Sequence, residues 1–190
     1  DFEISEAETR ALKDMALQFG ATLFMVLVAA HNILLSKLSG QEEIIIGSPI
    51  AGRRHSDIEK IIGMFVGTLV LRNTPRGTYT FKNFLGNVKR KTLEAFENQE
   101  YSFADLVDKV VKNRETNRNP IFDVGFNFLK QQKAAANSSA RETGFNHHKE
   151  GTSKFDLSLI VMDNGENIDL SYEYCTDLFK PHFIDRLIGY

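Results

Sequence analysis

The chain has 190 residues, 42% hydrophobic and 25% charged, a composition ordinary for a globular protein large enough to bury a core. The formal net charge of −2 argues against nucleic acid or an anionic membrane as a partner. The single cysteine, Cys175, cannot form an internal disulfide and indicates a reducing compartment. Acidic residues stand where a signal peptide would carry basic ones, so we expect a cytoplasmic protein.

The first 40 residues predict two helices. Ser5 and Glu8 match a capping box, so a helix should begin at Ser5 and end near Gly20. Thr22 is the expected cap of a second helix that reaches about Leu38 and is apolar on almost every side. Residues 15–36 carry no charged side chain and are long enough to span a bilayer, but the break at Gly20 favours two helices of a globular core.

The middle of the chain predicts two apolar strands followed by two helices. Residues 43–46 form a short run of branched side chains, and the glycines and proline of residues 47–54 indicate a loop after it. A single helical turn at 57–61 and a strand at 64–71 should follow. Thr80 begins a longer helix with one apolar stripe, and residues 102–110 predict a short one.

The last third of the chain changes to a period of two. Apolar residues alternate with polar ones over 122–128, 155–161 and 168–174, which predicts three strands. The turn residues at 163–165 join the last two strands as an antiparallel hairpin, and residues 131–143 predict a loop. A final helix should begin at Pro181. Because helices and mixed strands alternate without a domain boundary, we expect one α/β sandwich with a mixed sheet.

Few residues suggest chemistry on their own. His147 and His148 are adjacent, so on a strand they would point to opposite faces and could not share a metal, and no metal site is expected. Residues 47–54 lack the pattern of a phosphate-binding loop, although a loop after a buried strand often borders a cleft. The simplest interpretation of Arg53, Arg54 and His55 is that they are solvated charges. Ser48 stands in no nucleophile elbow.

Three segments, residues 62–72, 98–103 and 114–122, resemble in this order the late motifs of the condensation domains of nonribosomal peptide synthetases. Residues 62–72 are similar to the family's Ile-Gly-x-Phe-Val-Asn-Thr…Arg, and residues 98–103 to its Asn-Gln-Asp-Tyr-Pro-Phe. Residues 114–122 are similar to its Arg-Asp-x-Ser-Arg-Asn-Pro-Leu-Phe. The flanking segments 34–41, 47–53, 153–157 and 174–179 agree as well, so the resemblance covers nearly the whole chain.

The resemblance implies one lobe of a chloramphenicol-acetyltransferase-like fold. Family members have two such lobes with a tunnel between them, where carrier proteins present donor and acceptor thioesters on phosphopantetheine arms for peptide-bond formation. The implied partners are the other lobe, the two carrier proteins and an adjacent adenylation domain; no cofactor is expected to bind directly. Members of this family make peptide antibiotics.

The catalytic motif of that family, His-His-x-x-x-Asp-Gly, lies in the first lobe and is missing from residues 1–190. His147 and His148 do not replace it, because their spacing is too short and they follow the late motifs. We therefore expect residues 1–190 to be the C-terminal lobe, with no catalytic residue and no activity alone. The resemblance implies two groups of site residues. The candidates for tunnel wall are Gly47, Ser48, Phe65, Val66, Gly67 and Thr68, and those for framework are Arg114, Arg118, Asn119 and Pro120.

Gly67 replaces the family's usual asparagine, so we expect a wider or looser wall there.

Two alternative functions stay open. One is epimerisation or heterocyclisation by a member of the same superfamily. The other is a module that docks carrier proteins without chemistry.

Overall fold

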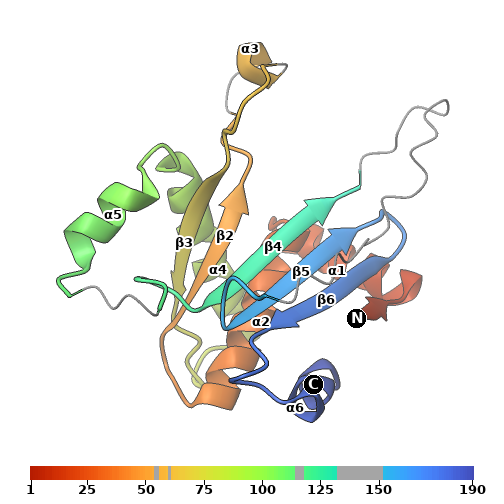
Figure 1. Ribbon diagram of the computed structural model, residues 1–190. Coiled ribbons are helices and arrows are strands. Elements are labelled where there is room, and N and C mark those ends of the chain that lie inside the picture. The colour runs from red at the N-terminus through yellow and green to blue at the C-terminus, as the bar shows by residue number, and fades with distance from the viewer. Residues whose placement is uncertain (54–55, 60, 114–117, 132–151) are drawn as a thin grey trace.

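The computed structural model describes residues 1–190 except 54–55, 60, 114–117 and 132–151 (Figure 1). In the described residues, the strands form one six-stranded sheet in the order β1-β6-β5-β4-β2-β3. Their bounds are β1 (Phe2–Ile4), β2 (Ile44–Ile50), β3 (Gly67–Asn73), β4 (Val124–Lys130), β5 (Leu157–Asp163) and β6 (Ile168–Tyr174). β2, β4 and β5 run parallel to one another, while β3, β6 and β1 each pair antiparallel with a neighbour. The predicted mixed sheet is confirmed.

In the parts of the chain that the structure describes, helices pack on both faces of this sheet, and the main core lies beneath one of them. The helices are α1 (Glu6–Gln18), α2 (Leu23–Ser39), α3 (Ser56–Glu59), α4 (Phe81–Glu97), α5 (Phe103–Val110) and α6 (Pro181–Ile188). α1, α2 and α4 pack against the sheet around buried residues such as Val28, Ile46 and Phe126. α6 closes a second, smaller cluster around Leu157 on the same face. α5 packs on the opposite face, where its Phe103 contacts Phe122. The result is an α/β sandwich, as predicted.

Capping side chains fix where the first helices begin. Ser5 and Glu8 form the predicted capping box, in which each side chain binds the other residue's backbone N–H. The hydroxyl of Thr22 accepts a hydrogen bond from the Met25 N–H, and that of Thr80 accepts one from the Asn83 N–H. These caps satisfy N–H groups that have no partner inside the helix, so the predicted helix starts are confirmed.

The boundaries of β2 and β3 differ from the prediction. β2 does not stop at Ile46 but continues through Gly47, Ser48 and Pro49, all paired with β3. Pro49 is tolerated because the pairing of β2 with β4 spans only Ile46 and Gly47, so beyond them β2 has a neighbour on one side only. β3 begins at Gly67, not at residue 64, so the apolar run before it is not strand.

The β1 end of the sheet contains one strand pairing that was predicted and one that was not. β5 and β6 form the expected antiparallel hairpin, although β5 begins at Leu157, two residues later than predicted. β4 is shifted in the same direction and begins at Val124. β1 was not predicted: it has three residues and pairs with β6, at the far end of the chain.

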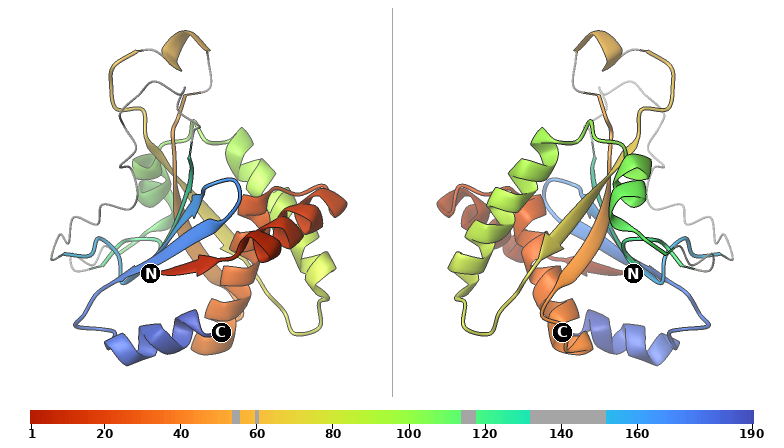
Figure 2. Two further views of the ribbon diagram at one scale, coloured as in Figure 1. Left: turned by 90° about the vertical axis from the view of Figure 1, so that its right-hand side faces the viewer. Right: turned by 90° about the vertical axis from the view of Figure 1, so that its left-hand side faces the viewer.

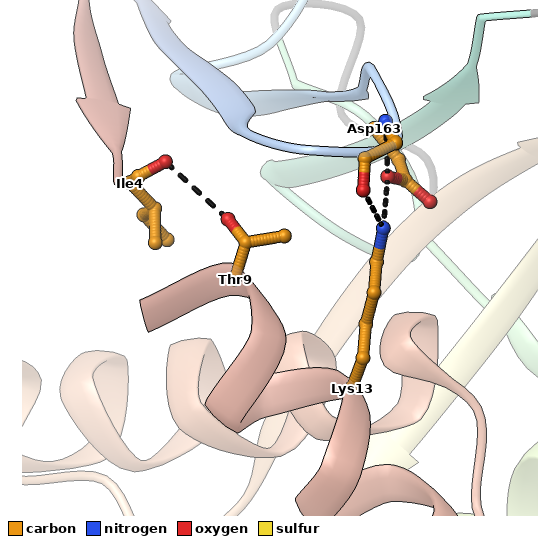
Figure 3. A network of polar contacts seen from close by, with 5 residues as sticks. Ile4, Thr9, Lys13 and Asp163 are labelled. Carbon is orange, nitrogen blue, oxygen red and sulfur yellow. Dashed lines mark hydrogen bonds and ion pairs between the residues drawn. The ribbon is translucent and has the colours of Figure 1, made fainter. Parts of the chain in front are cut away.

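A lysine ties α1 to the turn of this hairpin (Figure 3). The Lys13 Nζ donates to the Asp163 carboxylate and to the Gly165 carbonyl, each at 2.7 Å. The Asp163 side chain is only 7% exposed and also accepts the Gly165 N–H. Nearby, the Thr9 hydroxyl donates to the Ile4 carbonyl at 3.3 Å, which joins α1 to β1.

The first testable prediction concerns this ion pair. Lys13→Met is expected to lower the free energy of unfolding by about 2 kcal/mol, because it leaves a nearly buried carboxylate without its cation. Urea denaturation measures the change. Arg10→Met is the matched control: its pair with Glu6 is 71% and 61% exposed and should contribute less than about 1 kcal/mol. Equal losses for both variants would contradict a special role for Lys13.

Among the described residues, no single helix is long and apolar enough to cross a membrane. α1 and α2 pass such a test only when taken together, and they are bent by 103° at the break between them.

Candidate functional site

Four of the six tunnel candidates lie in the β2–β3 pair. Gly47 and Ser48 are in β2, and Gly67 and Thr68 begin β3. The other two, Phe65 and Val66, come just before β3, and Val66 is exposed. Residues 65–68 therefore lie where the sheet gives way to the β2–β3 connection, while Gly47 pairs with Val70 at the middle of the two strands.

The four strand candidates are divided between the two faces of the sheet. Ser48 pairs with Leu69, and Gly67 with Ile50, on the same face as Ile46, which packs in the core beneath the helices. Gly47 and Thr68 alternate with these residues and so belong to the opposite face. The pairs Ser48–Gly67 and Gly47–Thr68 therefore cannot line one cavity together. Which of them faces a tunnel stays a prediction.

On the face without α2, an aromatic ring fills the space beside Gly47. A Cβ atom built on Gly47 would lie 2.0 Å from the Phe122 Cζ. The buried Phe122 ring also contacts Phe103 of α5 and Phe155, with centroid distances of 5.8 and 5.3 Å. Gly47 is thus a packing position for Phe122, because only a residue without a side chain admits the ring so close to the strand.

On the helix-covered face, Ser48 borders a mostly apolar pocket of about 390 Å³. The pocket lies between the start of α2, the C-terminal part of α4 and the ends of β2 and β4, and its lining residues are Thr22, Phe24, Met25, Ser48, Pro49, Ile50, Leu93, Phe96 and Phe128. Ser48 itself is 2% exposed. The chemistry of this pocket suits an apolar group and offers no acid or base.

A larger hollow of about 910 Å³ lies at the other end of α2, against the connection from β3 to α4. Lys37, Glu42 and Arg76 line it together with Tyr79 and Phe84. None of the tunnel candidates borders it. The size of a hollow does not by itself identify a binding site, so the candidate site is assigned to the part of the sheet that carries the tunnel candidates.

Arg53, interpreted from the sequence as a solvated charge, has a structural role. Its guanidinium donates to the carbonyls of Ile58, Ile61 and Gly63, the last two at 2.9 and 3.2 Å. It also lies 4.4 Å from the centroid of the Phe65 ring. Sequence analysis misses this role because the partners are backbone carbonyls, which any residue type could supply.

The framework motif ties the start of β4 to the neighbouring strand. Arg118 binds the Asp123 carboxylate, and the Asn119 side-chain oxygen accepts the N–H groups of Ile121 and Phe122 at 3.3 and 3.5 Å. The Asp123 carbonyl in turn accepts the Asp156 N–H at 3.1 Å. Arg118 and Asn119 thus hold the turn that positions Phe122. Pro120 lies within this turn, while Arg114 lies outside the described residues.

Asp156 is a titratable group close to this motif. Partial burial and the negative charge of Asp123 raise the pKa of its carboxyl, while Arg118 opposes the rise. No group of three or more potential ligands that could hold a metal ion occurs in the described part of the chain. His147 and His148 lie outside that part.

Comparison with known proteins decides the family. The model of the family described as Condensation domain matches residues 1–190. The chain belongs to the condensation domain family. Its fold is accordingly the chloramphenicol-acetyltransferase-like fold that the sequence led us to expect.

Curated relatives are peptide synthases. The chain is 42% identical over 193 residues to bacitracin synthase 2 of Bacillus licheniformis, covering 99% of this chain and 7% of that protein. It is 43% identical over 188 residues to gramicidin S synthase 2 of Brevibacillus brevis, covering 98% of this chain and 4% of that protein. The chain thus spans less than a tenth of the length of these relatives.

Solved structures share the fold at lower identity. A four-domain nonribosomal peptide synthetase, holo-AB3403, superposes with a TM-score of 0.85 at 20% identity, covering 98% of this chain and 15% of that chain. The X-domain from teicoplanin biosynthesis gives 0.81 at 19% identity, covering 98% of this chain and 43% of that chain. The teicoplanin X-domain chain is therefore more than twice as long as the chain described above.

Proposed function

We propose that this chain is the C-terminal lobe of a nonribosomal peptide synthetase condensation domain, and that the complete domain forms peptide bonds between thioesters on carrier proteins. The observation that carries the proposal is the family match over residues 1–190, with relatives at 42% and 43% identity that are synthases of bacitracin and gramicidin S. The product of this protein is accordingly expected to be a peptide antibiotic.

The chain covers less than half of solved domains with the same fold, which supports its assignment to one lobe. The chain covers 43% of the teicoplanin X-domain and 42% of the first condensation domain of the calcium-dependent antibiotic synthetase. The His-His-x-x-x-Asp-Gly motif does not occur in its 190 residues. We infer that the catalytic histidine belongs to the other lobe and that this chain contributes tunnel wall and framework. Holding two tethered reactants in near-attack geometry is a large part of such catalysis.

The proposal includes partners and a place of action. Donor and acceptor carrier proteins would present their thioesters on phosphopantetheine arms at the two ends of the tunnel, with an adenylation domain next in the same cytoplasmic synthetase. This lobe would bind no cofactor of its own. Phe65, Val66 and Gly67, at the end of the β2–β3 pair, are the residues we propose for the wall, together with Ser48, which shares the face of Gly67 and borders the apolar pocket.

Product analysis separates the possible reactions. The complete condensation domain is incubated with donor and acceptor carrier proteins loaded with different amino acids, and the products released from both arms are analysed by chiral chromatography and mass spectrometry. A dipeptidyl thioester of unchanged stereochemistry supports condensation. Inversion of the donor residue would show epimerisation, loss of water from a cyclised product would show heterocyclisation, and carrier binding without product would show a docking module.

The second testable prediction addresses Gly67. A Cβ at this position would lie 3.3 Å from the Ile50 Cγ1, a side chain that can move, so Gly67→Asn should cost less than about 1 kcal/mol in stability. We expect it to change the ratio of rates for a large and a small acceptor by about tenfold in the complete domain. Gly77→Asn, at a position with no atom within 4 Å, is the control. An unchanged ratio would argue against a role for Gly67 in the wall.

A further inference from the structure

A hollow with two parts lies between α2, α4 and the connection of residues 74–80 that joins β3 to α4, and is here named the β3–α4 hollow. Figures 1 and 2 show this connection beside the C-terminal end of α2. The large part measures about 910 Å³ and the small part about 200 Å³. Arg76, Tyr79 and Phe84 line both parts, so the two are adjacent. Together they have room for a small organic ligand.

The small part of the hollow carries two cations without an ion-pair partner. Arg90 lines it but is paired with Glu94 at 2.7 Å. Arg76 and Lys91 line it too, and neither forms an ion pair with any of the described residues. The Lys91 Nζ donates to the Arg72 carbonyl at 2.8 Å, which holds the ammonium group in place. An anion of phosphate size suits this pair of cations.

The electrostatic surroundings of Lys91 agree with an anion site. Burial lowers the pKa of its ammonium group, and the positive charges of Arg72 and Arg90 lower it further, against the opposing charges of Glu43 and Glu94. A negative charge bound between these cations would relieve their repulsion.

A buried amide borders the same small part. Asn73, the last residue of β3, is 2% exposed, and its side-chain oxygen has no hydrogen-bond partner among the described residues. A buried acceptor without a donor costs free energy, so a ligand that brings a hydroxyl group gains by donating to it. The small part therefore asks for two groups at once, an anion and a hydroxyl donor, which sugar phosphates combine.

The large part adds an aromatic ring to this chemistry. Tyr79 is 39% exposed, and its N–H donates to the Arg76 carbonyl at 2.9 Å, so one turn of the chain carries both the ring and the unpaired cation. Lys37 and Glu42 also line the large part, and their opposite charges leave it without a net charge. An uncharged, flat aromatic group fits such a space beside a tyrosine ring.

We propose that the β3–α4 hollow binds a nucleoside phosphate, with the phosphate between Arg76 and Lys91, a ribose hydroxyl donating to Asn73 and the base against Tyr79. The inference goes beyond the proposed function and does not rest on it, because none of these residues belongs to the candidate tunnel or framework.

Isothermal titration of the complete condensation domain with adenosine 5′-monophosphate tests the site. The domain is prepared without its neighbouring domains and in a buffer free of phosphate, so that no other site or ion competes. We expect a Kd below about 1 mM, weakened at least about tenfold by Arg76→Gln. Arg10→Gln is the control of equal charge, since the Arg10 side chain lies on α1 and is 71% exposed. Absence of binding, or equal weakening by the two variants, would overturn the proposal.

Smaller probes separate the two parts of the hollow. Ribose 5-phosphate should bind about tenfold more weakly than the nucleotide, because it lacks the stacked base. Tyr79→Leu should weaken the nucleotide by a similar factor and leave ribose 5-phosphate unchanged. Inorganic phosphate that binds as tightly as the nucleotide would show a site for a free anion and overturn the assignment to a nucleoside phosphate. Thermal unfolding of each variant without ligand shows whether it is folded, as expected for substitutions at the exposed positions 76 and 79.

Discussion

Replacing Gly47 with alanine is expected to lower the free energy of unfolding by about 3 kcal/mol, a large loss for the addition of one methyl group. The new Cβ would lie 2.0, 2.1 and 2.6 Å from three atoms of the Phe122 ring, which is buried between Phe103 and Phe155. The ring must leave its site, so the variant loses the packing of a buried phenylalanine. Chemical denaturation measures the loss.

A double-mutant cycle tests the cause of this loss. Phe122→Ala alone should cost about 3–5 kcal/mol, and in that background Gly47→Ala should cost less than about 1 kcal/mol, because the obstructed ring is gone. Gly86→Ala is the control: it lies within α4 with no atom near the new Cβ, and should stabilise the chain by about 0.5–1 kcal/mol. Additive costs for Gly47→Ala and Phe122→Ala would contradict the packing account.

Mild acid is expected to destabilise the chain through His31. The residue is buried in α2, its Nδ1 lies 3.4 Å from the Tyr172 hydroxyl, and its Nε2 has no hydrogen-bond partner in the structure. Burial lowers the pKa of His31 from 6.5 to about 4. Because the folded state binds the proton less tightly than the unfolded state, this contribution to stability is complete above about pH 6.5 and is lost as the pH falls toward 4.

The size of the acid effect follows from the lowered pKa of His31. A difference of one in pKa between the folded and unfolded states corresponds to about 1.4 kcal/mol. The free energy of unfolding should therefore fall by about 2 kcal/mol between pH 7 and 5, and by about 3 kcal/mol by pH 4. Denaturation at several pH values measures it. His31→Leu should remove most of the loss above pH 5, where few carboxyl groups titrate, whereas His182→Gln, at an exposed position, should not. An unaltered profile for His31→Leu would show that another group is responsible.

Much of the fold could be predicted because its signals are local. The capping side chains Ser5, Thr22 and Thr80 determine helix starts within a few residues of themselves, and the alternation around the turn at 163–165 indicates the β5–β6 hairpin. β1 could not be predicted, since it forms only by pairing with β6 across the whole chain. Pro49 was a misleading signal: its effect depends on which side of β2 has a neighbour, and this is a property of the sheet order.

The tunnel role of the six candidate residues stays a prediction, and their arrangement in the sheet could not be predicted from the sequence. The resemblance to condensation domains selected residues of β2, of the start of β3 and of the segment just before β3. It could not reveal that Gly47 accommodates Phe122, because the two are 75 positions apart and the contact exists only after folding. Nor could it reveal the role of Arg53, whose partners are backbone carbonyls.

The central claim, that this chain is one lobe of a peptide-bond-forming domain and lacks the catalytic histidine, is tested most directly by a reconstitution assay. Dipeptidyl thioester is measured by mass spectrometry on loaded carrier proteins with three samples: residues 1–190 alone, the preceding lobe alone, and the complete domain. The account predicts product from the complete domain only. Product from residues 1–190 alone would contradict it.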